Sequence, residues 1–200
     1  NNKTLVEEAI EMIEEERAKA PRLLLIDSGD FSQGSPYYNI YQGEVEVKLM
    51  NMMRYDVATI GNHEFDFGME NMARIFKMAD FPIVCSNYDF TGTVLEGIVK
   101  PYTIIKRDGV KIGLFGLCPP LKGLVFDHNC EGVKYLDPAV EGQRWADYLK
   151  NVKKCDIVIC VSHLGWKMGK KVDDDDNRVI PKMRGVDLVL GGHSHSYLPT

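Results

Sequence analysis

Short apolar segments recur along this chain, and stretches with helical spacing of apolar residues lie between them. The apolar runs are too short for helices and predict buried β-strands at residues 22–27, 56–60, 81–85, 156–161 and 186–190. The helical patterns predict α-helices at residues 4–20, 45–53, 68–79 and 137–153. A series of strands alternating with helices predicts an α/β fold.

Local signals mark two helix starts and one hairpin. Residues 4–7, Thr-Leu-Val-Glu, form a capping-box pattern, and residues 137–138, Asp-Pro, are typical of an N-cap and the first helical position. The pair Asp-Gly at 108–109 separates apolar runs at 102–105 and 110–116, which predicts an antiparallel hairpin. An antiparallel pair within a β/α series predicts a mixed sheet.

Composition limits the classes of function. The chain has 200 residues, of which 44% are hydrophobic, and this suffices for one globular unit with a single core. A formal net charge of -5 argues against binding to a nucleic-acid polymer, which requires a basic surface. A small phosphate ester stays compatible, because a metal ion can supply positive charge locally. No apolar run approaches the roughly 18 to 20 residues that a membrane span needs.

Three further features of the sequence do not indicate a reaction or a binding site. The five cysteines are odd in number and contain no Cys-x-x-Cys pair, and we expect a structural role for them. Cys85, Cys155 and Cys160 lie in or beside apolar runs, where thiols usually behave as small buried hydrophobic side chains. The acidic run at 173–176 is expected to be a solvated loop. His128-Asn129-Cys130 contains metal-binding side chains, but no partner residue accompanies it at ligand spacing.

Polar side chains follow four of the predicted strands. In sheets of this kind, ligands bind in the loops beyond the carboxyl ends of the strands. Imidazole, carboxylate and amide groups together suit a borderline divalent ion such as zinc or manganese, whereas calcium takes oxygen ligands alone. Each histidine taken singly fits a surface or core role, but four of the five lie at strand ends and favour a shared site. The candidate residues are Asp30, Asn62, His63, His163, His193 and His195.

The last two histidines add a geometric expectation. His193 and His195 alternate about Ser194, so in an extended chain their rings would share one side, as two metal ligands could. Gly29, Gly61, Gly191 and Gly192 fit loops that approach an ion or a phosphate closely.

These motifs, in this order, resemble those of the calcineurin-like metallophosphoesterases. The motifs are Gly29-Asp30, Gly61-Asn62-His63-Glu64, Ser162-His163 and Gly191-Gly192-His193-Ser194-His195. The longer stretches at 27–34, 63–68 and 162–165 are similar to the periplasmic 5'-nucleotidase branch, in its N-terminal catalytic domain. The similarity extends over essentially the whole chain.

The resemblance implies a four-layer αββα sandwich, with mixed β-sheets flanked by helices, that holds two divalent metal ions. By position, Asp30 would bridge the two ions. Asn62, His163 and His193 would complete the ligand set of the second ion, and His195 would be a ligand of the first.

The resemblance also implies catalytic roles. His63 would be the catalytic imidazole, and Asp66 would be its orienting carboxylate. A metal-bound hydroxide would attack phosphorus in line, while His63 stabilises the transition state or protonates the departing alkoxide.

One motif of the family is missing from the sequence. The family begins with Asp-x-His on its first strand, and no aspartate in this chain is followed by histidine two residues later. The first ion would then keep only Asp30 and His195, whereas the second would keep four protein ligands. We therefore expect one ion or none, zinc, manganese or similar, and impaired catalysis. The expected domain covers residues 1–200 and lacks its first strand and its C-terminal end.

The sequence thus predicts a metal-dependent phosphoric ester hydrolase of the 5'-nucleotidase type, acting on a small phosphate ester such as a nucleotide. The alternatives are a 2',3'-cyclic nucleotide phosphodiesterase and a catalytically impaired metal-binding fragment or interaction domain. A nucleotide-binding P-loop or dinucleotide fold finds no support, because the required glycine-rich motifs are missing. A periplasmic or extracellular location, and a separate nucleoside-recognition domain, follow only from the resemblance.

Overall fold

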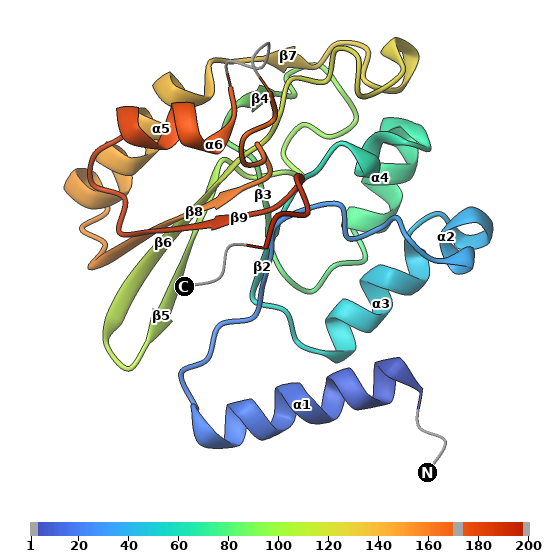
Figure 1. Ribbon diagram of the computed structural model, residues 1–200, viewed down its shortest axis with the longest axis horizontal. Coiled ribbons are helices and arrows are strands. Elements are labelled where there is room, and N and C mark those ends of the chain that lie inside the picture. Colours follow the sequence, from blue (N-terminus) through green and yellow to red (C-terminus); the bar gives the residue numbers. More distant parts are fainter. Residues whose placement is uncertain (1–3, 170–173, 198–200) are drawn as a thin grey trace.

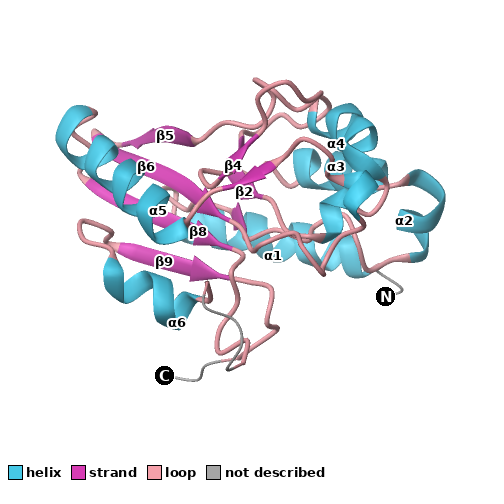
Figure 2. Ribbon diagram, turned by 90° about the horizontal axis from the view of Figure 1, so that it is seen from above, coloured by secondary structure: helices cyan, strands magenta, loops and turns pink. Residues whose placement is uncertain are grey.

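Two β-sheets lie face to face at the centre of the structure, and helices cover their outer faces (Figures 1 and 2). The computed structural model describes residues 4–169 and 174–197. The first sheet has the order β1-β2-β3, and both of its strand pairs are parallel. The second has the order β5-β6-β8-β9, with β5 antiparallel to β6 and the other pairs parallel. A short antiparallel pair, β4-β7, lies apart from both.

The strands are β1 (Ile26–Asp27), β2 (Val57–Thr59), β3 (Ile83–Val84), β4 (Tyr88–Asp89), β5 (Tyr102–Arg107), β6 (Val110–Leu117), β7 (Lys134–Tyr135), β8 (Ile157–Ser162) and β9 (Leu188–Gly191). The α-helices are α1 (Leu5–Lys19), α2 (Pro36–Tyr41), α3 (Glu44–Met52), α4 (Gly68–Phe76), α5 (Pro138–Asp147) and α6 (Asp176–Val179). Short turns of 3-10 helix are η1 (His63–Phe65), η2 (Asp127–Asn129) and η4 (Ile180–Lys182), and η3 (Tyr148–Val152) is a π-helical turn.

Three buried clusters show why these elements form four layers. The cluster between the sheets joins strand residues of both, including Val57, Val84, Leu114 and Val161. A second cluster packs helices α3 and α4 on the first sheet. A third packs α5 and α6 on the second sheet. The predicted αββα architecture is therefore confirmed, although the first sheet is parallel and only the second is mixed.

Most predicted elements are confirmed, with shorter strands in the first sheet. The hairpin pairs β5 with β6 around residues 108–109, and Thr4 and Glu7 form the expected capping box. In the run at 22–27, only Ile26 and Asp27 pair with β2. Just before them, the N–H of Leu25 donates to the carboxylate of Asp56 (2.9 Å) and not to a strand carbonyl.

Two helical predictions need adjustment. Asp137 caps α5 by accepting from the N–H groups of Ala139 and Val140, but the helix changes to the π-helical turn at Tyr148. Helix α2 was not predicted, since its six residues are too few to show a helical pattern.

The prediction of a solvated acidic run is wrong for the part that the structure describes. Asp175 and Asp176 are only 0% and 4% exposed. Asp175 accepts from the backbone N–H of Met168 and from Arg178, and Asp176 accepts from the hydroxyl of Ser162. Local charge density predicted solvation, but Ser162, Met168 and Arg178 pair with these buried carboxylates. Asp173 lies outside the described residues.

The cysteine prediction agrees with the structure. All five cysteines are free, and Cys85, Cys118, Cys155 and Cys160 are buried. In the described ranges, we find no helix with the length and apolar character needed to cross a bilayer.

Candidate metal centre

Loops that follow β1, β2, β8 and β9 meet at one rim of the sandwich, and glycines permit their approach. A Cβ atom on Gly29, whose φ is 92°, would lie 2.6 Å from the nitrogen of Gly61 and 2.7 Å from Nδ1 of His163. A Cβ atom on Gly192 would lie 2.9 Å from the carbonyl oxygen of Ser28. Contacts this short exclude any side chain, so glycine is required where the loops cross.

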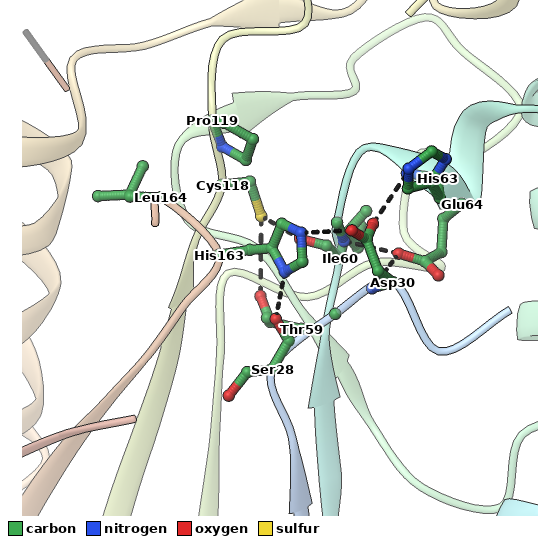
Figure 3. A network of polar contacts seen from close by, with 12 residues as sticks. Ser28, Asp30, Thr59, Ile60, His63, Glu64, Cys118, Pro119, His163 and Leu164 are labelled. Carbon is green, nitrogen blue, oxygen red and sulfur yellow. Dashed lines mark hydrogen bonds and ion pairs between the residues drawn. The ribbon is translucent and has the colours of Figure 1, made fainter. Parts of the chain in front are cut away.

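Asp30, His163 and His193 form a cluster at this rim. Their potential ligand atoms all lie within 4.8 Å of one another. Figure 3 shows the contact between the side chains of Asp30 and His163. Oδ2 of Asp30 lies 2.8 Å from Nε2 of His163, and the rings of His163 and His193 are 4.9 Å apart between centroids. Nδ1 of His163 contacts the carbonyl oxygen of Ser28, which fixes the ring and leaves Nε2 on the side of Asp30.

The charges within this cluster are coupled. Burial alone would raise the pKa of Asp30, but His163 and the backbone N–H of His63 lower it, so the net pKa lies below the ordinary value. Burial likewise opposes charge on His163, yet its contact with Asp30 raises its pKa overall. Burial and the neighbouring His163 lower the pKa of His193, which favours the neutral imidazole that a metal ligand needs.

Asn62 adds a buried oxygen atom in the loop after β2. It follows β2, is 5% exposed, and its Oδ1 atom has no hydrogen-bond partner among the described residues. A buried oxygen without a partner costs about 1 to 3 kcal/mol, and a divalent ion would satisfy it. The combination of carboxylate, amide oxygen and two imidazoles suits zinc or manganese. The residues present therefore fit a divalent ion.

His63 and Asp66 form a pair beside the cluster. Turn η1 places them three residues apart on one side, with 2.9 Å between Nδ1 of His63 and Oδ2 of Asp66. The N–H of His63 donates to Oδ1 of Asp30 (2.9 Å), and its carbonyl accepts from the hydroxyl of Tyr38 (2.9 Å). The backbone of His63 is thus fixed, while its side chain stays 39% exposed and open to a ligand.

Glu64 has a role that the sequence interpretation did not assign. Its side chain is buried and accepts from the N–H groups of Asp30, Gly61 and Ser32, and from the hydroxyl of Ser32. Burial and the negative charge of Asp30 raise the pKa of Glu64. Its carboxylate joins the loop after β1 to the loop after β2 (Figure 3). The only sequence signal for this role was its place next to His63.

A pocket of about 510 Å³ opens over the cluster. Its lining includes Asp30, His163, Trp166, Asp176, His193 and His195. The extended chain expected at His193 and His195 does not form, because both have left-handed backbones, with φ values of 68° and 50°. His195 is exposed and lies outside the group of ligand atoms within 4.8 Å, although it lines the same pocket.

Comparisons with known proteins agree with this geometry. The sequence model of the calcineurin-like phosphoesterase family matches residues 3–197. The chain is 33% identical to snake venom 5'-nucleotidase of Crotalus adamanteus, over 94% of this chain and 31% of that protein. It is also 33% identical to human 5'-nucleotidase, over 94% of this chain and 32% of that protein.

A solved structure gives the same result for the fold. The crystal structure of the 5'-nucleotidase precursor from Thermus thermophilus matches with a TM-score of 0.84 at 29% identity, covering 96% of this chain and 36% of that one. The chain therefore spans about a third of the length of these relatives.

Proposed function

Because the chain belongs to the calcineurin-like phosphoesterase family, we propose that it forms the catalytic part of a metal-dependent phosphoric ester hydrolase of the 5'-nucleotidase type. The cluster of Asp30, His163 and His193 beside the His63–Asp66 pair is the main support. The 5'-nucleotidases among its relatives support a nucleoside 5'-monophosphate as the substrate.

Members of this family use divalent metals, and we assign the metal-binding role to five residues. They are Asp30, Asn62, His163, His193 and His195. Asp30 would be the shared carboxylate, since it contacts His163 through one oxygen and the backbone of His63 through the other. Bound divalent ions would supply positive charge against the phosphoryl oxygens and would lower the pKa of water.

His63 is the proposed proton donor to the leaving group. Asp66 holds Nδ1, so Nε2 is the nitrogen left to face the ester. An imidazolium at this position donates its Nε2 proton to the departing alkoxide, and its charge stabilises the phosphoryl group as negative charge develops. Hydrogen bonds from Tyr38 and to Asp30 fix the backbone that carries the ring.

The test is phosphate release from AMP with added Mn²⁺ or Zn²⁺, comparing the parent protein with His63→Asn. We expect His63→Asn to lower kcat by about 10² to 10⁴ fold, the usual contribution of a positioned acid or base. Glu8→Gln, an exposed change on α1, is the control and should retain full activity. If His63→Asn releases phosphate as fast as the parent, the assigned role is wrong. Faster hydrolysis of 2',3'-cyclic AMP than of AMP would favour the phosphodiesterase alternative.

Two finer assignments accompany this proposal. A location outside the cytoplasm is supported by the snake venom relative, and cell fractionation tests it. A separate nucleoside-recognition domain is compatible with relatives about three times as long as the matched region. Both assignments concern the whole protein.

A further inference from the structure

Asp176, at the start of α6, contacts the ends of two neighbouring strands. The residue is 4% exposed, and it lines the pocket over the metal cluster. Ser162 and Gly191 are the last residues of β8 and β9 and are paired in register across the two strands. His163 follows Ser162 directly, and His193 comes two residues after Gly191. Asp176 therefore lies where the chain leaves both strands toward candidate metal ligands.

One oxygen of Asp176 holds the end of β8. Oδ1 accepts a hydrogen bond from the hydroxyl of Ser162 (2.5 Å), and the oxygen of that hydroxyl accepts from the N–H of Leu164 (3.2 Å). Ser162 and Leu164 are buried, at 0% and 1% exposed, so water does not compete for these bonds. The two residues flank His163, and the bonds therefore fix the backbone that carries its ring.

The other oxygen of Asp176 borders the end of β9. A Cβ atom on Gly191 would lie 3.1 Å from Oδ2 of Asp176. The backbone of Asp176 adds a third contact, because its N–H donates to the carbonyl oxygen of Gly165 (2.9 Å). A Cβ atom on Gly165 would lie 3.1 Å from Cδ2 of His193. The loop that Asp176 holds after β8 therefore also borders the ring of His193.

The two residues beside Asp176 make contacts of a different kind. The side chains of Asp175 and Asn177 accept from the N–H groups of Met168 (3.0 Å) and Lys167 (2.9 Å), further along the same loop. Within the described residues, the lining of the metal pocket includes Asp176 but neither of these neighbours. Asn177 thus attaches α6 to the loop without a part in the contacts at the strand ends.

We propose that Asp176 is a positioning residue of the metal centre, and that it sets the spacing of His163 and His193. It does so by holding the paired ends of β8 and β9 together. This inference rests on the proposed function and adds a residue to its metal site. Among the described residues, Asp176 is not part of the group of ligand atoms within 4.8 Å of one another, so it acts through the strand ends and not as a ligand.

The experiment measures Mn²⁺ binding without substrate, from the electron paramagnetic resonance signal of free Mn²⁺. In Asp176→Ala, Kd for Mn²⁺ should rise about 10 to 100 fold, the usual effect of removing a group that orients metal ligands. Asp176→Asn keeps an acceptor oxygen for Ser162, so its Kd should stay closer to that of the parent. Asn177→Ala removes an attachment of α6 and is the control, which should bind Mn²⁺ as the parent does.

A double-mutant cycle distinguishes positioning from a general loss of stability. Ser162→Ala removes the other partner of the hydrogen bond, so Asp176→Ala should weaken Mn²⁺ binding much less in Ser162→Ala protein than in the parent. Far-UV circular dichroism identifies the folded variants, and Kd is compared among these. If Asp176→Ala does not fold, Ser162→Ala takes its place, and its Kd should rise. Lower stability with an unchanged Kd in the folded variant would overturn the positioning role.

Mn²⁺ binding also separates this inference from the proposed function. A selective loss of affinity in Asp176→Ala supports the positioning role even if no ester is hydrolysed. Equal Kd values for Asp176→Ala and the parent would overturn that role, whatever the rate of phosphate release from AMP. Equal losses in Asp176→Asn and Asp176→Ala would assign the effect to charge and would also overturn it. A parent protein that binds no Mn²⁺ would contradict the metal assignment and this inference together.

Discussion

The buried carboxylate of Glu64 accepts a hydrogen bond from the backbone N–H of Asp30 (2.9 Å), and Asp30 has a left-handed backbone with a φ of 62°. For a residue other than glycine this conformation costs roughly 1 to 2 kcal/mol, so surrounding contacts must hold it. The same carboxylate also accepts from Gly61 and Ser32. Glu64 therefore holds the central candidate ligand in the conformation that the cluster requires.

We predict that Glu64→Gln weakens both folding and metal binding. The amide group would replace one acceptor oxygen with a donor, leaving at least one buried N–H unpaired at a cost of about 1 to 3 kcal/mol. Urea unfolding measures the stability, and Mn²⁺ titration measures the affinity. Ser32→Ala, which removes one hydroxyl donor to Glu64, should have a smaller effect on both. Unchanged Mn²⁺ affinity in Glu64→Gln would show that Glu64 does not position Asp30.

The meeting of the strand ends could be predicted from sequence because it depends on chain-local patterns. Apolar runs identify the strands, and parallel strands place their carboxyl ends at one edge, so Asp30 and His163 were expected at one rim. The structure brings them to 2.8 Å. The capping box at Thr4 and the N-cap at Asp137 are likewise local signals, and both are confirmed.

Features that depend on distant partners could not be predicted in this way. Four consecutive aspartates indicate solvation when read locally, but the buried Asp176 accepts from Ser162, which lies 14 residues away. The extended backbone expected at His193 gives way to a left-handed turn, in which the N–H of Ser194 donates to the carbonyl oxygen of Gly192 (2.8 Å). The local sequence therefore predicts neither the partner of Asp176 nor the turn at His193.

The burial of Asp176 predicts a dependence of stability on pH. Burial raises the pKa of Asp176 from 3.8 to about 6, despite the opposing hydrogen bond from Ser162. The folded state then binds the proton more strongly than the unfolded state. This stabilisation is complete below about pH 4 and is lost as the pH rises through 6, in total roughly 3 kcal/mol.

Urea unfolding of the chelator-treated protein between pH 4 and 8 measures this effect. Asp27, whose pKa burial also raises to about 6, contributes in the same window, so the informative quantity is the difference between variant and parent. We expect Asp176→Asn to lose part of the decline in stability with rising pH. The exposed Asp147→Asn change on α5 should retain the full decline. An identical profile for Asp176→Asn and the parent would contradict the assignment.

The unpartnered oxygen of Asn62 predicts opposite effects on the metal-free and metal-bound protein. Asn62→Leu removes a buried polar group that lacks a hydrogen bond, so the metal-free protein should be as stable as the parent or more stable. The same change removes a proposed ligand and should reduce the stabilisation by Mn²⁺, which amounts to about 2.7 kcal/mol for an intact site at 100 times Kd. Thermal unfolding with chelator and with Mn²⁺ measures both quantities.

Asn87 offers the matched control for this comparison. It is also a buried asparagine, but its side chain is fully engaged: its Nδ2 donates to the carbonyl of Cys118 and its Oδ1 accepts from the N–H of Cys118, each at 2.8 Å. Asn87→Leu should therefore destabilise the metal-free protein by a few kcal/mol, because two buried backbone groups lose their partners. It should leave the increment from Mn²⁺ unchanged. If Asn62→Leu behaves like Asn87→Leu, the oxygen of Asn62 serves the fold and does not bind the ion.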